Sequence, residues 1–177
     1  VIMCWWWFGF EQVFFFTDPQ TGEPLGWDDG SPREPGEYYC GGGAGNVVGR
    51  EISDAHLEAC LDLGITLTGT NAEVALGQWE YQCFGKGIKA ADDLWVSRYL
   101  LYKIAEEYGV GVNIHPKPKT GDWNGSVMHC TFSNEAMRTA GSEELFSSMC
   151  DTLVAVHEAG LSSYCSDDDM RLTCLHE

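Results

Sequence analysis

Residues 71–82 read NAEVALGQWEYQ and place Glu73 and Glu80 beside glycine and aromatic side chains in an apolar neighbourhood. From Gln78 onward, polar and aromatic residues alternate, which predicts a strand with one polar face and one core face. A carboxylate that loses its water on such a strand needs a cation nearby. We therefore predict that Glu73 and Glu80 belong to a cation site.

Two other ionisable residues have the same kind of surroundings. Glu11 lies in the aromatic segment 8–12, and His129 lies in the apolar segment 127–130. Together with Glu73 and Glu80 they supply oxygen ligands and one imidazole, a set that suits divalent metal ions. Each residue has an alternative to metal binding. A single histidine such as His129 is more often a core residue whose ring nitrogens form hydrogen bonds. Glu11 would instead form a salt bridge with an arginine.

The remaining pattern predicts an α+β domain with an antiparallel or mixed sheet. Strands are expected at 8–16 and 65–70, and residues 17–49, rich in glycine and proline, are expected to form an irregular segment. Helices are expected at 53–63 with Ser53 as N-cap, at 92–108, and at 142–156 with an acidic first turn. Strands and helices interleave without internal repeats, as in a single α+β unit.

Composition excludes several kinds of partner. The 177 residues carry a net charge of −17 with only 10 lysines and arginines, which argues against binding to nucleic acid or to an anionic membrane. No apolar run approaches the ~20 residues that a membrane helix needs. The eight cysteines contain no C-x-x-C pair, so we expect reduced thiols in a reducing compartment.

Several motifs occur in the order found in eukaryotic-type glutamine synthetases, and the chain resembles that family over nearly its whole length. They are Phe8-Gly9-x-Glu11, Gln78-Trp79-Glu80, Gly121-Asp122-Trp123-Asn124-Gly125 and Arg171-Leu172-Thr173-x-Leu175-His176-Glu177. The resemblance implies a curved sheet that carries the metals and is flanked by helices. It also implies an ATP-dependent ligase that phosphorylates the side chain of glutamate and lets ammonia displace the phosphate, in glutamine biosynthesis.

The resemblance also implies a role for each matched residue. Glu73 and Glu80 would hold one Mg²⁺ or Mn²⁺ ion, and Glu11 and His129 would hold a second. The other roles are catalysis by Glu177 and Arg171, glutamate binding by Asn124, Gly125 and Arg171, and nucleotide binding by Trp7, Thr131 and Ser133.

By the same resemblance, residues 1–177 correspond to part of a catalytic domain, without the family's amino-terminal β-grasp domain and the end of the catalytic domain. The full-length protein is then expected to be a homo-oligomer. Its expected location is the cytoplasm, with a plastid as the alternative.

Four positions depart from the family pattern, one of them being Thr131, which stands where the family has asparagine near the nucleotide. Val13 stands where the family has the second glutamate of a Glu-x-Glu pair, so one metal carboxylate is missing, and Val127 and Cys174 replace glycines. A valine at positive φ would be strained. Two alternatives therefore stay open: a γ-glutamyl ligase that uses another amine, and a metal-impaired or non-catalytic module with the same fold.

Overall fold

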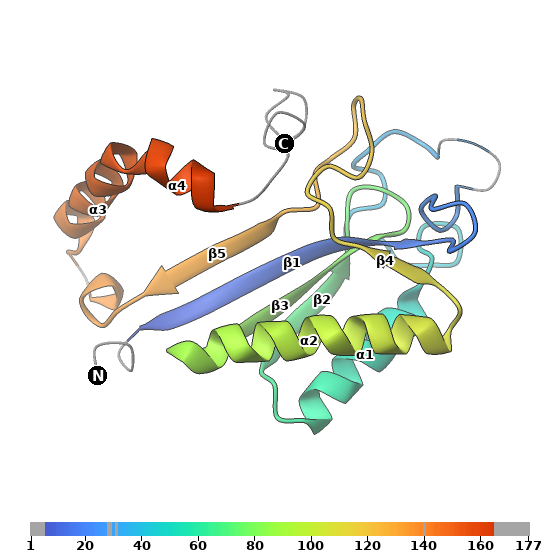
Figure 1. Cartoon of the computed structure of the whole chain (residues 1–177), viewed down its shortest axis with the longest axis horizontal. Helices are drawn as coiled ribbons and strands as arrows, with labels where there is room; N and C mark the ends of the chain where they lie inside the picture. Colours follow the sequence, from blue (N-terminus) through green and yellow to red (C-terminus); the bar gives the residue numbers. More distant parts are fainter. Residues whose placement is uncertain (1–5, 28–29, 31, 140, 165–177) are drawn as a thin grey trace.

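β1 (Trp7–Thr17) is the long strand around which the other elements are arranged in the computed structural model (Figure 1). The structure describes residues 6–27, 30, 32–139 and 141–164. The other elements are β2 (Leu67–Ala72), β3 (Gln78–Lys86), β4 (Gly111–Asn113), β5 (Met128–Ser133), α1 (Arg50–Asp62), α2 (Ile88–Glu107), α3 (Glu143–Ala155), α4 (His157–Tyr164) and a short 3₁₀ turn, Ala136–Arg138. Every pairing among these strands is antiparallel.

The sheet has five strands, and β1 lies in its middle. β3 pairs with β1 from Trp7 to Phe15 and carries β2 on its other edge. β5 pairs with the first half of β1, and β4 pairs with its last three residues. The predicted α+β class is confirmed, with an antiparallel sheet that is open rather than curled (Figure 1).

One face of the sheet is the core face, and α1 and α2 cover it (Figure 1). Phe14, Trp79 and Tyr81 point to this side and are almost completely buried. They pack with Leu101 of α2 and Cys60 of α1. Burial of such side chains contributes about 1.5–3 kcal/mol each, so this layer is the main source of stability.

The opposite face carries the polar residues of β3 and is covered only in part. Near the end of β1, a second small cluster of Phe15, Trp27 and Ala75 is buried beneath the irregular segment 17–49. Leu76 and Trp123 pack against it, and the indole of Trp27 donates a hydrogen bond to the carbonyl oxygen of Leu76 at 2.9 Å. Trp27 of the predicted irregular segment therefore packs at one end of the polar face, whereas Leu25 and Val47 of the same segment pack against the core cluster.

Two helices begin earlier than the sequence predicts. α1 follows Gly49, whose φ is 80°, so Ser53 lies inside the helix and bonds the Thr70 hydroxyl at 2.7 Å instead of capping. α2 follows Gly87, whose φ is 58°, and starts at Ile88 rather than Asp92. In both cases the residue before the helix is a glycine with a positive φ, a conformation that other residue types rarely adopt. The glycine changes the direction of the chain so that the helix begins at the next residue. β2 lies two residues later than predicted.

The predicted helix at 142–156 is present as α3, but its apolar face is not buried. None of its residues is buried, and Phe146 and Leu153 are exposed. Figure 1 shows α3 and α4 together, away from α1 and α2. In the described part of the chain, no helix is long and apolar enough to cross a membrane.

Candidate metal centre

The register of three strands places the predicted site residues on one face of the sheet. On β1, side chains of odd-numbered residues share a face, because successive residues point to opposite sides. Glu11 lies opposite His129 of β5 and Gln82 of β3, and Val13 lies opposite Glu80. This face is the one that α1 and α2 leave open.

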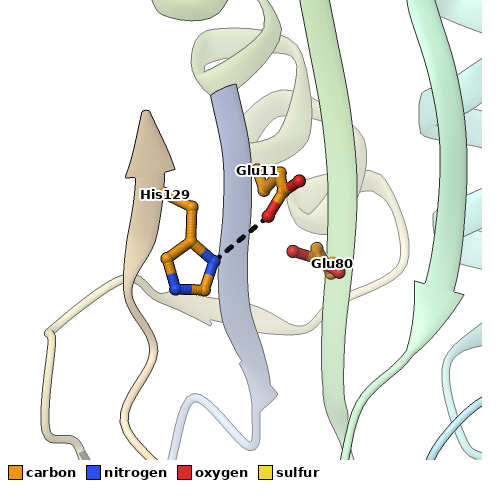
Figure 2. Close-up of side chains that lie close together, drawn as sticks. All are labelled: Glu11, Glu80 and His129. Carbon is orange, nitrogen blue, oxygen red and sulfur yellow. Dashed lines mark hydrogen bonds and ion pairs between the residues drawn. The ribbon is translucent and has the colours of Figure 1, made fainter. Parts of the chain in front are cut away.

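Glu11, Glu80 and His129 converge within this face (Figure 2). One ligand atom from each lies within 4.8 Å of the other two. A ring nitrogen of His129, Nδ1, lies 3.1 Å from Oε2 of Glu11. The three side chains come from three neighbouring strands, in the order β5, β1 and β3 (Figure 2). Two carboxylates and an imidazole at this spacing fit a divalent metal ion.

The electrostatics of the cluster favour a cation. Glu80 is only 9% exposed, and in the described part of the chain no lysine or arginine forms an ion pair with it. Burial raises the pKa of Glu73 above its ordinary value, and the charge of Glu80 adds to the rise. Carboxylates brought together without a positive partner repel each other, and a bound cation removes that cost.

Glu73 lies beside Glu80 but outside the group of three. It follows β2 in the connection to β3, where Oε2 accepts a hydrogen bond from the backbone N–H of Val74 at 3.1 Å. Asn71 donates to its other oxygen at 3.4 Å. The structure therefore brings together three of the four predicted ligands and holds the fourth at the side of Glu80. Metal ligation by these residues stays a prediction.

Val13 lies where the missing carboxylate would be. It is 6% exposed, and its position opposite Glu80 and two residues from Glu11 puts it beside both acids on the same face of the sheet. Its N–H donates to the carbonyl oxygen of Val127 at 3.1 Å. Cys40 is the one non-glycine residue of the described chain with a positive φ. Val127 is therefore free of the strain considered from the sequence.

The predicted nucleotide residues lie on the same face, at the start of β1. Trp7 is opposite Ser133, and Gly9 is opposite Thr131. Lys86, at the end of β3, places its ammonium group 4.3 Å from the centre of the Trp7 ring. Arg138 donates a hydrogen bond to the Ser133 hydroxyl at 2.7 Å. Aromatic and cationic groups thus meet about 13 Å along β1 from Glu11.

The predicted glutamate loop lies toward the other end of the face. Gln78 of β3, 1% exposed, donates from Nε2 to the carbonyl oxygen of Gly125 at 2.9 Å. The same amide lies 3.3 Å from the hydroxyl of Ser126. Gln78 lies two residues before Glu80 on β3. Its contacts therefore hold the segment that follows Asn124 close to Glu80. Arg171, Cys174 and Glu177 lie outside the described residues.

Sequence reasoning assigned no role to three residues of this face. Gln78 holds the loop, Lys86 lies over Trp7, and Gln82 lies opposite Glu11 and donates to Asn71 at 3.0 Å. The alternation along β3 is enough to place these three residues on the face of Glu80, because positions 78, 80, 82 and 86 share one side of the strand.

The structure defines an α+β protein whose open antiparallel sheet carries a candidate site for a divalent metal ion on its uncovered face. Comparison with known proteins then gives the family. Residues 7–159 match the family model described as "Glutamine synthetase, catalytic domain", and the chain belongs to the glutamine synthetase family.

The chain is similar to glutamine synthetases from fungi and bacteria. It is 45% identical over 175 residues to that of Yarrowia lipolytica, covering 97% of this chain and 47% of the relative. It is 46% identical over 175 residues to that of Fusarium solani, covering 97% and 48%, respectively. It is 48% identical over 180 residues to that of Bradyrhizobium diazoefficiens, covering 97% and 51%. The chain thus spans about half the length of these relatives.

Proposed function

We propose that this chain is the metal-, nucleotide- and glutamate-binding part of a ligase that joins glutamate and ammonia at the expense of ATP. The observation that carries the proposal is the alignment of three groups on one face. The predicted nucleotide group lies at one end and consists of Trp7, Ser133 and Lys86. The candidate metal ligands lie in the middle and are Glu11, His129 and Glu80. The predicted glutamate loop, held by Gln78, lies at the other end.

The proposed reaction has two steps. An oxygen of the glutamate γ-carboxylate attacks the γ-phosphorus of ATP, the bond to ADP breaks, and a γ-glutamyl phosphate forms. Ammonia then attacks the acyl carbon, phosphate leaves with the bonding electrons, and the nitrogen loses a proton, which gives glutamine. Divalent ions supply neutralisation of the phosphate charge in such transfers.

The residues of this chain have binding and positioning roles in that scheme. Glu11, Glu80 and His129 would hold the divalent ion, Mg²⁺ or Mn²⁺, with Glu73 beside them. Trp7 would offer a flat surface to the nucleotide near the hydroxyls of Thr131 and Ser133, and the ammonium of Lys86 lies close enough to favour an anion. Asn124 and Gly125 would orient glutamate beside the ion.

Further parts of the proposal concern residues and units outside the described structure. Arg171 would engage glutamate or the transferred phosphate, and Glu177 would close over the acyl phosphate to exclude water. We propose that the complete protein is a homo-oligomer in the cytoplasm and that residues 1–177 form part of its catalytic domain.

Trapping the activated glutamate tests the proposal. The chain is incubated with ATP, glutamate, Mn²⁺ and hydroxylamine, and γ-glutamyl hydroxamate is measured for the unmodified chain and for Val13→Glu. We expect glutamate-dependent hydroxamate that increases in Val13→Glu and is lost in Glu80→Gln. Absence of product from both the unmodified chain and Val13→Glu would contradict the ligase proposal. Comparing ammonia with methylamine as acceptor distinguishes a ligase that uses another amine.

A further inference from the structure

The predicted glutamate loop is closed at its base by hydrogen bonds within segment 115–126. The backbone N–H of Ser126 donates to the carbonyl oxygen of Pro116 at 2.7 Å. The backbone N–H of Lys117 donates to Nδ1 of His115 at 3.1 Å. Asn124 therefore lies in a loop whose two ends are joined to each other, and its orientation depends on the contacts inside that loop.

Lys117 lies within this loop and is 4% exposed, and no other lysine or arginine of the described chain is buried. Its ammonium group donates a hydrogen bond to the carbonyl oxygen of Trp123, the residue before Asn124. A buried ammonium group has lost its hydration, so hydrogen bonds within the protein must replace the water. Because the donor is charged, this bond holds the carbonyl of Trp123 more strongly than a neutral donor would.

Buried side chains thus hold the peptide groups that precede and follow the Asn124-Gly125 pair. Lys117 binds the carbonyl oxygen of Trp123, and Gln78 donates to that of Gly125 at 2.9 Å. The C=O and N–H of a trans peptide group point in opposite directions, so the N–H of Asn124 points away from Lys117. Within the described residues, the N–H groups of Asn124 and Gly125 form no hydrogen bond. Both are therefore available as donors to a ligand.

The side chain of Trp123 attaches the loop to the rest of the site. Its ring packs against that of Trp27, with 4.6 Å between the ring centres. The indole of Trp27 donates to the carbonyl oxygen of Leu76 at 2.9 Å, and Leu76 lies in the same connection between β2 and β3 as Glu73. The ring of Trp123 thus fixes where the loop lies, and the bond from Lys117 fixes how its peptide group is turned.

We propose that Lys117 is a positioning residue, which sets the direction of the Asn124 N–H and thereby the affinity of the loop for a carboxylate substrate. The inference rests on the proposed function, because glutamate is the ligand concerned. Without the ammonium group, the peptide group between Trp123 and Asn124 is free to rotate, and its N–H has no fixed direction. Donors that are ordered before binding lower the entropy cost of binding. Loss of Lys117 should therefore weaken glutamate binding and leave the metal ligands unchanged.

Two measurements on the full chain test this inference. Lys117→Met has a side chain of similar length without the charge, and Lys117→Arg keeps the charge. Hydrogen exchange of the chain without ligand, followed by mass spectrometry, reports the order of residues 118–127. Calorimetry in the presence of Mn²⁺ reports the affinity for glutamate. For Lys117→Met we expect exchange in 118–127 to become about tenfold faster and glutamate binding to become about tenfold weaker. Exchange in β1 and β3 should not change, Mn²⁺ affinity should stay within about threefold, and Lys117→Arg should recover part of the glutamate affinity.

Lys119→Met is the matched control. Lys119 lies in the same loop but is more exposed and pairs with Glu23, so its removal should leave the affinity for glutamate within about threefold. Unchanged exchange in Lys117→Met, faster exchange with unchanged glutamate affinity, or an equal loss of affinity in Lys119→Met would overturn the inference. If Lys117→Met does not fold by circular dichroism, amide NMR of the unmodified chain decides. Glutamate should then shift the resonance of the Asn124 N–H more than those of β4, and the absence of such a shift would refute the role of this donor.

The outcome is separable from that of the proposed function. Absence of glutamate binding by the unmodified chain would contradict the proposed function, whereas hydrogen exchange, measured without glutamate, decides by itself whether Lys117 orders the loop. Equal glutamate affinity in the unmodified chain and in Lys117→Met would agree with the proposed function and refute the positioning role of Lys117.

Discussion

Replacing Val13 by glutamate is expected to destabilise the chain without metal and to create a second ion site with it. The substitution removes a nearly buried valine, 6% exposed, whose burial contributes about 1.5 kcal/mol or more. It also places a carboxylate directly opposite Glu80. At a separation of about 5 Å and an effective dielectric constant of about 20, two carboxylates repel by roughly 3 kcal/mol.

An available ion offsets most of this loss of stability. With chelator present, we expect the free energy of unfolding of Val13→Glu to be about 3–5 kcal/mol below that of the unmodified chain. Each ion site filled at a 100-fold excess over its dissociation constant adds about 2.7 kcal/mol. Because Val13→Glu should hold one ion more than the unmodified chain, saturating Mn²⁺ should stabilise the variant by about 3 kcal/mol more.

Urea unfolding followed by tryptophan fluorescence, with EDTA or with Mn²⁺, measures both effects. Val13→Gln is the control, because it has the shape of glutamate without its charge. It should lose the packing contribution and gain no ion. Equal stabilisation by Mn²⁺ in the unmodified chain and in Val13→Glu would refute the placement of Val13 beside the metal ligands.

Three further predictions concern packing, two of them at the open face of the sheet and one in the core. Gly9→Ala should cost about 1–3 kcal/mol of stability in urea unfolding, because a Cβ there would lie 2.6 Å from the Thr131 hydroxyl oxygen. Adding Thr131→Ala should recover most of the loss, and no recovery would exclude this clash as its cause. Gln78→Ala should cost roughly 1–3 kcal/mol and speed proteolysis near Gly125, whose carbonyl loses its donor; unchanged proteolysis would mean that Gln78 does not hold the loop. Burial raises the pKa of Cys60 from 9.0 to about 12, so iodoacetamide at about pH 8.5 should modify it only after unfolding. The unfolded chain loses this thiol proton at a lower pH than the folded chain. The free energy of unfolding should therefore keep the full contribution of Cys60 below about pH 9 and decrease toward pH 12. If iodoacetamide labelled Cys60 of the folded chain as fast as that of the unfolded chain, the burial of Cys60 would be contradicted.

The sequence predicts which residues of one strand share a face of the sheet more reliably than it predicts which residues of different strands are in contact. The alternation that begins at Gln78 correctly separates Gln78 and Glu80 from Trp79 and Tyr81, because side chains of a strand point alternately to its two sides. The pairing of Glu11 with His129 joins residues that are far apart in the sequence, on two strands that are neighbours in the sheet. It depends on the register of β1 with β5, which no local pattern specifies.

The starts of α1 and α2 show a second limit. Gly49 and Gly87 have positive φ, and each turns the chain into its helix several residues before the predicted start. A glycine in a sequence permits this conformation without requiring it. The sequence therefore favoured Ser53, a frequent N-cap residue, whereas the structure uses its hydroxyl to contact Thr70.

The most direct test of the metal centre formed by Glu11, Glu80 and His129 is a crystal structure of the chain with Mn²⁺, recorded at a wavelength where manganese scatters anomalously. We predict an anomalous peak at about 2.0–2.3 Å from an oxygen of Glu11, an oxygen of Glu80 and one ring nitrogen of His129. The absence of an anomalous peak, or a peak remote from all three ligands, would contradict this account.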